Sequence, residues 1–402
     1  MERTDLMKLL FAVCISLIIF ILPNVLTWGA DVPGVTSNTV KFGGMGDLTG
    51  MAAEVWVPAA EAIRTQIRQI NDTGGIHERK IKFILENDHY SIPRALSAFK
   101  KLVFRDKVFA VQGASGMGHT HAIIPLAEKA GIPMIAVTND NRYFEPVRKY
   151  LFSPLPFYED QIKLIFEYIW GDLKAENPII GFASPDVGAG KICRDLVRNE
   201  ASMHNLKEVH EAMFPVGSSD CTTEVMRFKK QKPDFIIIYG APATTSPFLR
   251  DSLKLGLSTT FIALQYSCVE PTIQIARKAT QNMIGVNCFS SWDEESPGMK
   301  KIRKITYQYS PRSTRRDRNY INGWILGFLI REGLKNAGRD LDREAFLRGL
   351  EGINNFDTQG ICGTVSFGPD DHKLIDDNRF YKADPDNMRL IPITGWRRPK
   401  SH

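Results

Sequence analysis

The sequence predicts an α/β protein built as two lobes, each with a parallel-type sheet that helices cover on both faces. Two observations predict this class. Short apolar runs alternate with stretches of helical periodicity along most of the chain, which is typical of repeated strand–helix–strand units. The alternation restarts after a junction that contains Pro154 and Pro156, so two series of comparable length follow one another. A length of 402 residues is compatible with two or three domains.

The N-terminus has the pattern of a secretory signal. Arg3 and Lys8 precede an apolar run over 9–22, and small residues follow at 27–30. This order of charged start, apolar segment and cleavage zone is typical of a signal peptide, and a spanning helix needs about 20 apolar residues. We therefore expect residues 1–29 to be a signal peptide and the protein to be exported. A retained membrane anchor is the alternative.

The first series contains four predicted strands with a helix between each pair. Ala59, Ile63 and Ile67 lie at helical spacing, and Gly74 with Gly75 ends that helix. The second helix has a proline in its first turn, where proline is tolerated, and a glycine closes the third. The expected order is strand 40–45, helix 59–70, strand 80–86, helix 93–103, strand 109–111, helix 120–130 and strand 133–137.

The second series repeats the pattern and ends in a segment of different character. Residues 234–239 form a continuous apolar run, typical of a strand covered on both faces, and Asp220 is placed to cap a helix. The expected order is helix 162–169, strand 179–183, helix 190–203, strand 209–214, helix 221–230, strand 234–239, a helix through 249 and 253, strand 261–264, helix 272–278 and strand 284–289. Helices at 297–309, 319–336 and 343–350 and strands near 362–367 and 379–382 follow, and we expect this segment to return to the lobes already built.

The composition is that of a soluble globular protein. Hydrophobic residues make up 43% and charged residues 24%, and 51 basic against 45 acidic residues leave a net charge of +6. An excess this small is weak evidence for nucleic-acid binding, so we expect no nucleic-acid partner. The sequence contains no nucleophile–base pair at recognisable spacing and no G-x-S-x-G motif, so no enzyme is expected.

The cysteines and histidines predict neither a metal site nor a cofactor. Five cysteines remain once Cys14 leaves with the signal, and none is paired as C-x-x-C. His119 and His121 have no partners at ligand spacing. We expect buried free thiols, with one disulfide as the alternative. The five cysteines are Cys193, Cys221, Cys268, Cys288 and Cys362.

Two loops are candidates for binding a small molecule. In open parallel sheets, ligands bind beyond the carboxyl ends of the strands. The glycine-rich stretch 113–120 lies at such a strand-to-helix junction, where free N–H groups and the helix dipole favour an anion such as a carboxylate. The polar stretch 138–141 follows the next strand at the same rim. The alternative is that glycine and asparagine only form tight turns here.

Several motifs, in this order, resemble the type I periplasmic binding proteins, specifically the leucine/isoleucine/valine-binding family of ABC importers. The likeness covers about residues 38–395, and the order and spacing of its pieces carry it. The matching pieces are FGGMGDLTG at 42–50, INDTGGIHERK at 70–80, LENDHYSIPRA at 85–95, VFAVQGASGMGHTHA at 108–122, EKAGIPMIAVT at 128–138 and PDFIIIYG at 233–240.

The resemblance implies two Rossmann-like lobes joined by a three-crossing hinge, with the ligand enclosed between them. Lobe one would combine 37–154 with 288–367, and lobe two would combine 155–287 with 368–402. The crossings would lie near Pro154, near Asn287 and beyond Phe367. Since Cys288 and Cys362 would both lie near crossings, a bond between them is also expected.

The same resemblance implies the site. An amino-acid binder of this family has an acidic group for the ligand's ammonium, but the aligned residue here is the neutral Gln265, although Asp140 or Asp186 could supply the charge instead. We therefore expect a ligand other than a plain branched-chain amino acid, such as an aromatic or aliphatic carboxylate or an amide. The implied ligand-binding residues are Trp56, Met117, Gly118, His119, Thr138, Asn139, Asp140, Val187, Ala241, Gln265 and Tyr266.

As function, the resemblance implies a periplasmic solute-binding protein that closes on a small molecule and presents it to the membrane permease of an ABC transporter. The alternatives are a ligand sensor of the same fold that regulates a signalling or transcription partner, and an enzyme on α/β lobes. The stretch 188–191 lacks the leading glycine and the final Ser/Thr of a phosphate loop. The basic run Arg312, Arg315, Arg316 and Arg318 is interpreted as a solvated loop, with docking to an acidic partner as the alternative.

Overall fold

A computed structural model describes residues 32–313 and 316–400. The predicted signal peptide at 1–29 therefore lies outside the described residues. Within the described ranges, no helix combines the length and the apolar character needed to cross a membrane.

The first sheet is parallel throughout and has five strands in the order β2-β1-β3-β4-β5. Its strands are β1 (Thr39–Gly46), β2 (Lys80–Asn87), β3 (Ala110–Gln112), β4 (Met134–Ile135) and β5 (Leu151–Phe152). The helices that follow these strands are α2 (Ala53–Asp72), α3 (Ile92–Lys100) with the short turn η1 (Lys101–Arg105), α4 (Met117–Ala130) and the turn η2 (Asn141–Tyr143).

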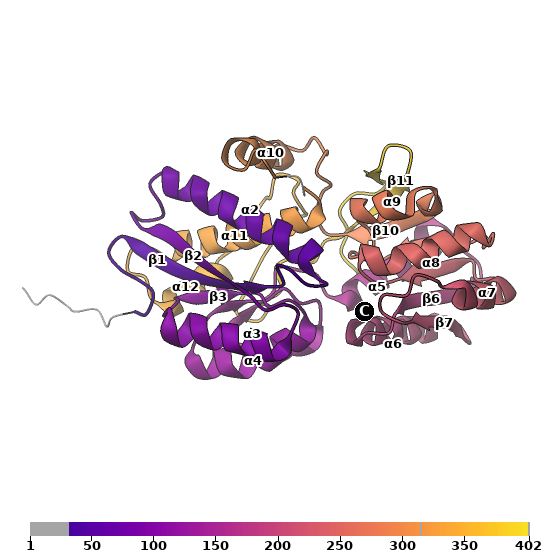
Figure 1. The fold of residues 1–402 in the computed structure, drawn as a ribbon, viewed down its shortest axis with the longest axis horizontal. Helices are drawn as coiled ribbons and strands as arrows, with labels where there is room; N and C mark the ends of the chain where they lie inside the picture. The colour runs from indigo at the N-terminus through magenta and orange to yellow at the C-terminus, as the bar shows by residue number, and fades with distance from the viewer. Residues whose placement is uncertain (1–31, 314–315, 401–402) are drawn as a thin grey trace, which may run out of the picture. The chain divides into compact units, whose positions relative to one another are not determined.

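Alternate residues of β1 divide the core of this half into two layers. Met45 is buried with Phe99 of α3 and Ile123 of α4. The ring of Phe42 points to the other face, where its centroid lies 5.6 Å from that of Phe346. Figure 1 shows α3 and α4 below this sheet and α2 with α11 above it. The late helices of this layer are α10 (Pro297–Tyr309), α11 (Arg318–Ala337) and α12 (Arg343–Glu351).

The second sheet has seven strands in the order β12-β11-β10-β9-β8-β6-β7. Its strands are β6 (Ile180–Pro185), β7 (Val209–Phe214), β8 (Phe235–Ile238), β9 (Thr260–Ala263), β10 (Met283–Asn287), β11 (Arg379–Asp384) and β12 (Arg389–Pro392). The helices and short turns around it are α5 (Tyr158–Glu167), η3 (Tyr168–Asp172), α6 (Gly188–Met203), α7 (Thr222–Gln231), α8 (Pro242–Lys254), α9 (Glu270–Ala276) and η4 (Arg277–Thr280).

Both faces of β8 are covered, as its continuous apolar run predicts. Ile236 and Ile238 are buried in a cluster with side chains of α7, α8 and α9. Ile237, between them, is buried in a cluster with side chains of α5 and α6. This division between the two faces explains why no polar residue interrupts the strand.

The C-terminal segment returns to a sheet that earlier strands have built, as predicted. β11 pairs antiparallel with β10, with Val286 opposite Phe380, and β12 extends the sheet by one more strand. The strand expected at 362–367 is wrong, because only Val365 forms an isolated bridge there, to Phe356. The short strand β5 and the edge strand β12 were not predicted. The residue boundaries of the two lobes stay a prediction.

The five described cysteines are free and buried, which confirms the interpretation as buried thiols. The expected bond between Cys288 and Cys362 is absent. Instead, the Cys288 thiol lies 3.4 Å from Gln265 Oε1 and 3.8 Å from Arg318 Nη2.

Replacing Arg343 with lysine is expected to lower the free energy of unfolding by about 1 kcal/mol. The half-buried guanidinium donates to the carbonyls of Ala130 and Gly131, each at 3.2 Å, and to that of Phe109, also at 3.2 Å. A lysine keeps the charge at the end of α4 but cannot reach three carbonyls. Urea unfolding measures the change, and Arg339→Lys on the surface, which leaves stability within error, is the control.

Candidate functional site

The residues predicted to hold a carboxylate lie in a helix rather than in a loop. The stretch 113–120 spans the expected junction between β3 and α4, but α4 begins at Met117 instead of the predicted residue 120, so that Gly118 and His119 are in its first turn. Gly116 precedes the helix and supplies no side-chain cap. The first N–H groups of α4 are therefore presented without a capping side chain.

His119 is buried beside an aromatic ring. It is 5% exposed, its ring centroid lies 4.8 Å from that of Tyr90, and its Nε2 has no hydrogen-bond partner. Gly118 faces Ile92, whose Cδ1 would lie 3.4 Å from a Cβ at that glycine.

Trp56 is fixed next to this helix start through Ser115. The indole N–H of Trp56 donates to the carbonyl of Ser115 at 3.2 Å. Ser115 is held in turn by Asp88, which accepts from its N–H at 3.2 Å and from its hydroxyl. The buried carboxylate thus stabilises the loop, and the hydrogen bond from Trp56 holds the tryptophan against it.

The second predicted loop divides into one unpartnered group and two partnered ones. Thr138 is buried with its hydroxyl unpartnered. Asn139 donates through Nδ2 to the carbonyl of Pro156 at 2.5 Å. Asp140 is paired with Arg142 through two bonds of 2.8 and 2.6 Å, so its charge is already neutralised.

The predicted residues from the second sheet lie at helix starts and at a strand end. Val187 and Ala241 are the N-cap residues of α6 and α8, and neither provides a side-chain cap. Gln265 and Tyr266 follow β9. Val187, Tyr266 and Met117 all pack against the same apolar cluster, so this cluster joins predicted residues from both sheets.

One hydrogen bond directly connects the predicted site residues of the first sheet with those of the second. The hydroxyl of Tyr266 donates to Asn139 Oδ1 at 3.0 Å. The N–H of Gln265 donates to Gln161 Oε1 at 3.2 Å. The structure therefore brings Asn139 and Tyr266 together, two residues that the sequence separates widely.

Replacing Tyr266 with phenylalanine is expected to lower the free energy of unfolding by about 1 kcal/mol, since Asn139 Oδ1 would lose its donor while it stays buried. Thermal unfolding of the free protein measures the loss. Tyr307→Phe is the matched control because Tyr307 is 52% exposed. Equal melting temperatures for both variants would contradict the importance of this bond.

The sequence analysis missed three tyrosines near these residues, namely Tyr90, Tyr158 and Tyr239. The hydroxyls of Tyr158 and Tyr239 lie 3.1 Å apart, and burial raises the pKa of both well above the ordinary value. The pKa of Tyr266 is raised to about 12, chiefly by burial, and Tyr90 adds to this rise. A signal for Tyr239 was present, since it ends a predicted strand at the carboxyl end, where ligands bind.

The interpretation of the basic run as a solvated loop is wrong for Arg318. Arg312 is exposed, as that interpretation requires, and Arg315 lies outside the described residues. Arg318, however, is 2% exposed and begins α11, whose neighbouring residues are buried as well. Arg318 is buried because it is the first residue of α11, a helix that is buried on nearly all sides.

Several buried polar atoms near these residues lack a hydrogen-bond partner, although most buried polar groups in proteins have one. They lie where strands of the two sheets end or at the starts of α4 and α11. These atoms are Gln112 Nε2, His119 Nε2, Thr120 Oγ1, Thr138 Oγ1, Gln265 Nε2 and Arg318 Nη1. Such a set of atoms can bind a polar ligand. Within the described ranges, no three His, Cys, Asp or Glu side chains are placed to hold a metal ion.

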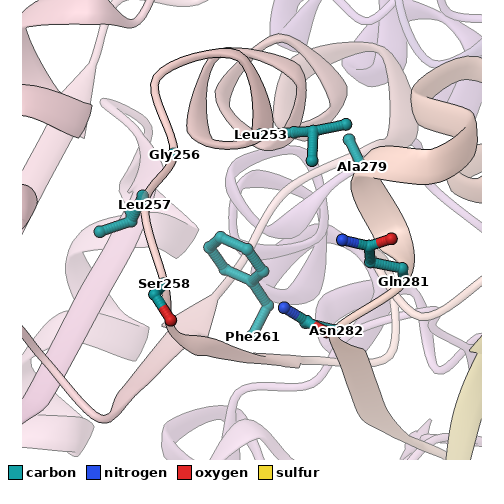
Figure 2. A pocket seen from close by; sticks show the side chains of 8 residues that line it. All are labelled: Leu253, Gly256, Leu257, Ser258, Phe261, Ala279, Gln281 and Asn282. Atoms are coloured by element: carbon teal, nitrogen blue, oxygen red, sulfur yellow. The ribbon is translucent and has the colours of Figure 1, made fainter.

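A separate hollow of about 250 Å³ lies at the other end of the second sheet (Figure 2). Phe261 at the start of β9 and Gln281 and Asn282 just before β10 line it. None of the predicted site residues lines this hollow. It lies at the amino ends of these strands, whereas ligands of parallel sheets bind at the carboxyl ends.

Near the carboxyl ends of their strands, where α/β proteins bind ligands, both parallel-type sheets have buried polar atoms without a hydrogen-bond partner. The family model described as periplasmic binding protein matches residues 39–387. The chain belongs to this family. The comparison with curated proteins finds no match.

Solved structures of the same fold include binding proteins for different ligands. A branched-chain amino acid ABC transporter protein from Thermus thermophilus with bound valine has a TM-score of 0.80 at 19% identity, covering 90% of this chain and 97% of its own. LivJ from Streptococcus pneumoniae with isoleucine has a TM-score of 0.74 at 19% identity, covering 89% and 99%. A fatty acid ABC transporter substrate-binding protein from Thermomonospora curvata has a TM-score of 0.77 at 18% identity, covering 91% and 94%.

Proposed function

We propose that this chain is the exported substrate-binding component of an ABC importer. Residues 1–29 would direct export to the periplasm. A small organic ligand with a carboxylate, aromatic or amino-acid-like group would bind between a lobe of 37–154 with 288–367 and a lobe of 155–287 with 368–402. Closure of the hinge on the ligand would present it to a membrane permease, without cofactor and without chemical change.

The observation that carries this proposal is the set of buried, unpartnered polar atoms contributed by both sheets. His119 and Thr138 come from the first sheet and its helices, and Gln265 follows a strand of the second. The bond between Tyr266 and Asn139 supports an arrangement in which both sets face one ligand. A ligand with several polar atoms would supply the missing hydrogen-bond partners.

The charges near these residues favour a ligand without a free ammonium group. Asp140 is paired with Arg142, and Asp186 is paired with Lys191 at 2.9 Å. Gln265 is neutral, so a buried ammonium would have none of these three residues as an unpaired counter-charge. Solved structures of the same fold are titled with valine, isoleucine and fatty acid, so the fold alone is compatible with amino acids and with other carboxylates.

A thermal-shift screen of the mature protein tests the proposal. Amino acids, aromatic acids, fatty acids and amides are each added in excess, and a true ligand at 100 times its Kd stabilises by about 2.7 kcal/mol. We expect stabilisation by one class, with the bound compound recovered unaltered. Turnover of the compound, or no stabilisation by any class, would refute a binding component. Tight binding of leucine with all other acids inert would refute the proposed ligand class.

A further inference from the structure

Arg318 is a buried cation whose described contacts are all neutral. Its Nε donates to Asn287 Oδ1 at 2.9 Å, and its guanidinium carbon lies 5.0 and 5.4 Å from the ring centres of Tyr266 and Phe289. Nη1 has no hydrogen-bond partner. The carboxylate of the neighbouring Asp317 accepts from backbone N–H groups at the start of α11. Ring faces and an amide oxygen compensate a buried charge only in part.

A second unpartnered donor lies beside the same thiol. Gln265 is 0% exposed, and its Oε1 lies 3.4 Å from Cys288 Sγ, which also lies 3.8 Å from Arg318 Nη2. With its oxygen directed to the thiol, Gln265 has its Nε2 left over, and this atom has no partner. Arg318, a cationic N–H donor, and Gln265, a neutral one, thus contact the same sulfur, and each has a buried nitrogen without a partner.

We propose that Arg318 and Gln265 together bind the carboxylate of the ligand, so that the substrate class is an organic carboxylate without a neighbouring ammonium. A water molecule could accept both hydrogen bonds but would leave the guanidinium charge uncompensated. A carboxylate satisfies the donors and the charge together, and an arginine fork suits its geometry. This inference rests on the proposed function and specifies its ligand.

The apolar part of such a ligand has a matching surface nearby. The ring of Tyr266 contacts Arg318 and packs against the apolar cluster that also receives Met117 and Val187. An aliphatic or aromatic carboxylate could therefore bury its carbon skeleton against this cluster while its carboxylate pairs with Arg318.

Matched pairs of compounds test the inference. Leucine is compared with 4-methylpentanoate, which lacks only the amino group, benzoate with benzamide, and octanoate with octanamide. Affinities are measured by calorimetry on wild type, Arg318→Gln, Gln265→Glu and Arg312→Gln. We expect at least one acid to bind and its amide partner to bind at least 100-fold more weakly. Arg318→Gln should lower the affinity for that acid at least 100-fold, and the exposed control Arg312→Gln should not change it.

Gln265→Glu keeps the arginine and so does not depend on whether Arg318→Gln folds. Its carboxylate would lie beside the guanidinium and take the place of the ligand's anion. We expect this variant to be at least as stable as wild type without ligand and to lose affinity for the acid at least 100-fold. A purely structural arginine would leave acid binding within a few-fold of wild type in this variant.

The outcomes separate this inference from the proposed function. Binding of an amide or of leucine with its acid analogue inert would overturn the carboxylate assignment but leave a binding component. Acid binding that survives both Arg318→Gln and Gln265→Glu would overturn the role of these residues. Failure of every compound to bind would overturn both proposals.

Discussion

Replacing Gly323 with alanine is expected to lower the free energy of unfolding by about 3 kcal/mol, the upper end for overpacking a core. Gly323 lies where α11 crosses α2. A Cβ there would lie 2.5 Å from Ala59 Cα and closer still to the Ala59 carbonyl oxygen, so the obstacle is backbone and not a flexible side chain. The two helices would have to move apart, because the backbone of Ala59 cannot turn away from the added methyl group.

Urea unfolding compares this variant with Gly171→Ala. A methyl group at Gly171 would meet no atom within 4 Å, so the same substitution there introduces no clash. Alanine has the better helix propensity, which would favour Gly323→Ala if packing were irrelevant. A Gly323→Ala protein as stable as the Gly171→Ala control would contradict the close helix contact.

Glu270 is expected to make the protein less stable as the pH rises from about 5 to about 7. Burial raises the pKa of Glu270 from its ordinary value of 4.5 to about 7, and Asp317 and Asp293 add to this rise. Its own backbone N–H and the hydroxyl of Ser291 act in the opposite direction. Between the two values the folded protein keeps a proton that the unfolded chain releases, so stability is present below pH 4.5 and falls as the pH rises through 7.

The expected loss from this carboxyl between pH 5.5 and pH 8 is about 2 kcal/mol, since one pKa unit corresponds to about 1.4 kcal/mol. Urea unfolding at both pH values measures it for wild type and for Glu270→Gln, which cannot ionise. The glutamine variant should lose about 2 kcal/mol less than wild type over this range. The same pH dependence in both proteins would show that another group is responsible.

Most elements of the fold follow from local sequence patterns. The strand at 209–214 and the helix at 297–309 have the bounds that apolar spacing predicts. The prediction of a strand at 362–367 was wrong because burial of Cys362, Val365 and Phe367 does not require a pairing partner. Periodicity reports which side chains are buried. It does not show which backbone segment, if any, pairs with a predicted strand.

The candidate site could be predicted only in part. The order of motifs placed Asn139 and Tyr266 in it, and a hydrogen bond joins them. The helix start at Met117 was missed because glycine-rich sequence favours a loop, whereas Gly116 only precedes the first turn. Tyr90 and Tyr158 were missed because Tyr90 lies in the turn before α3 and Tyr158 begins α5, and neither position stands out in the sequence.

The class of fold follows from the sequence, because alternating strand and helix patterns admit few arrangements other than parallel sheets covered by helices. The burial of Arg318, in contrast, is visible only in the folded protein. In the chain it is one of several arginines in a polar stretch, and such a stretch is ordinarily solvated. Its burial depends on α11 packing against α2, more than 200 residues earlier in the chain, and on Asn287 and Cys288, which contact it from the end of β10. Local patterns carry no information about such distant contacts, and these contacts determine which charge is left without a partner.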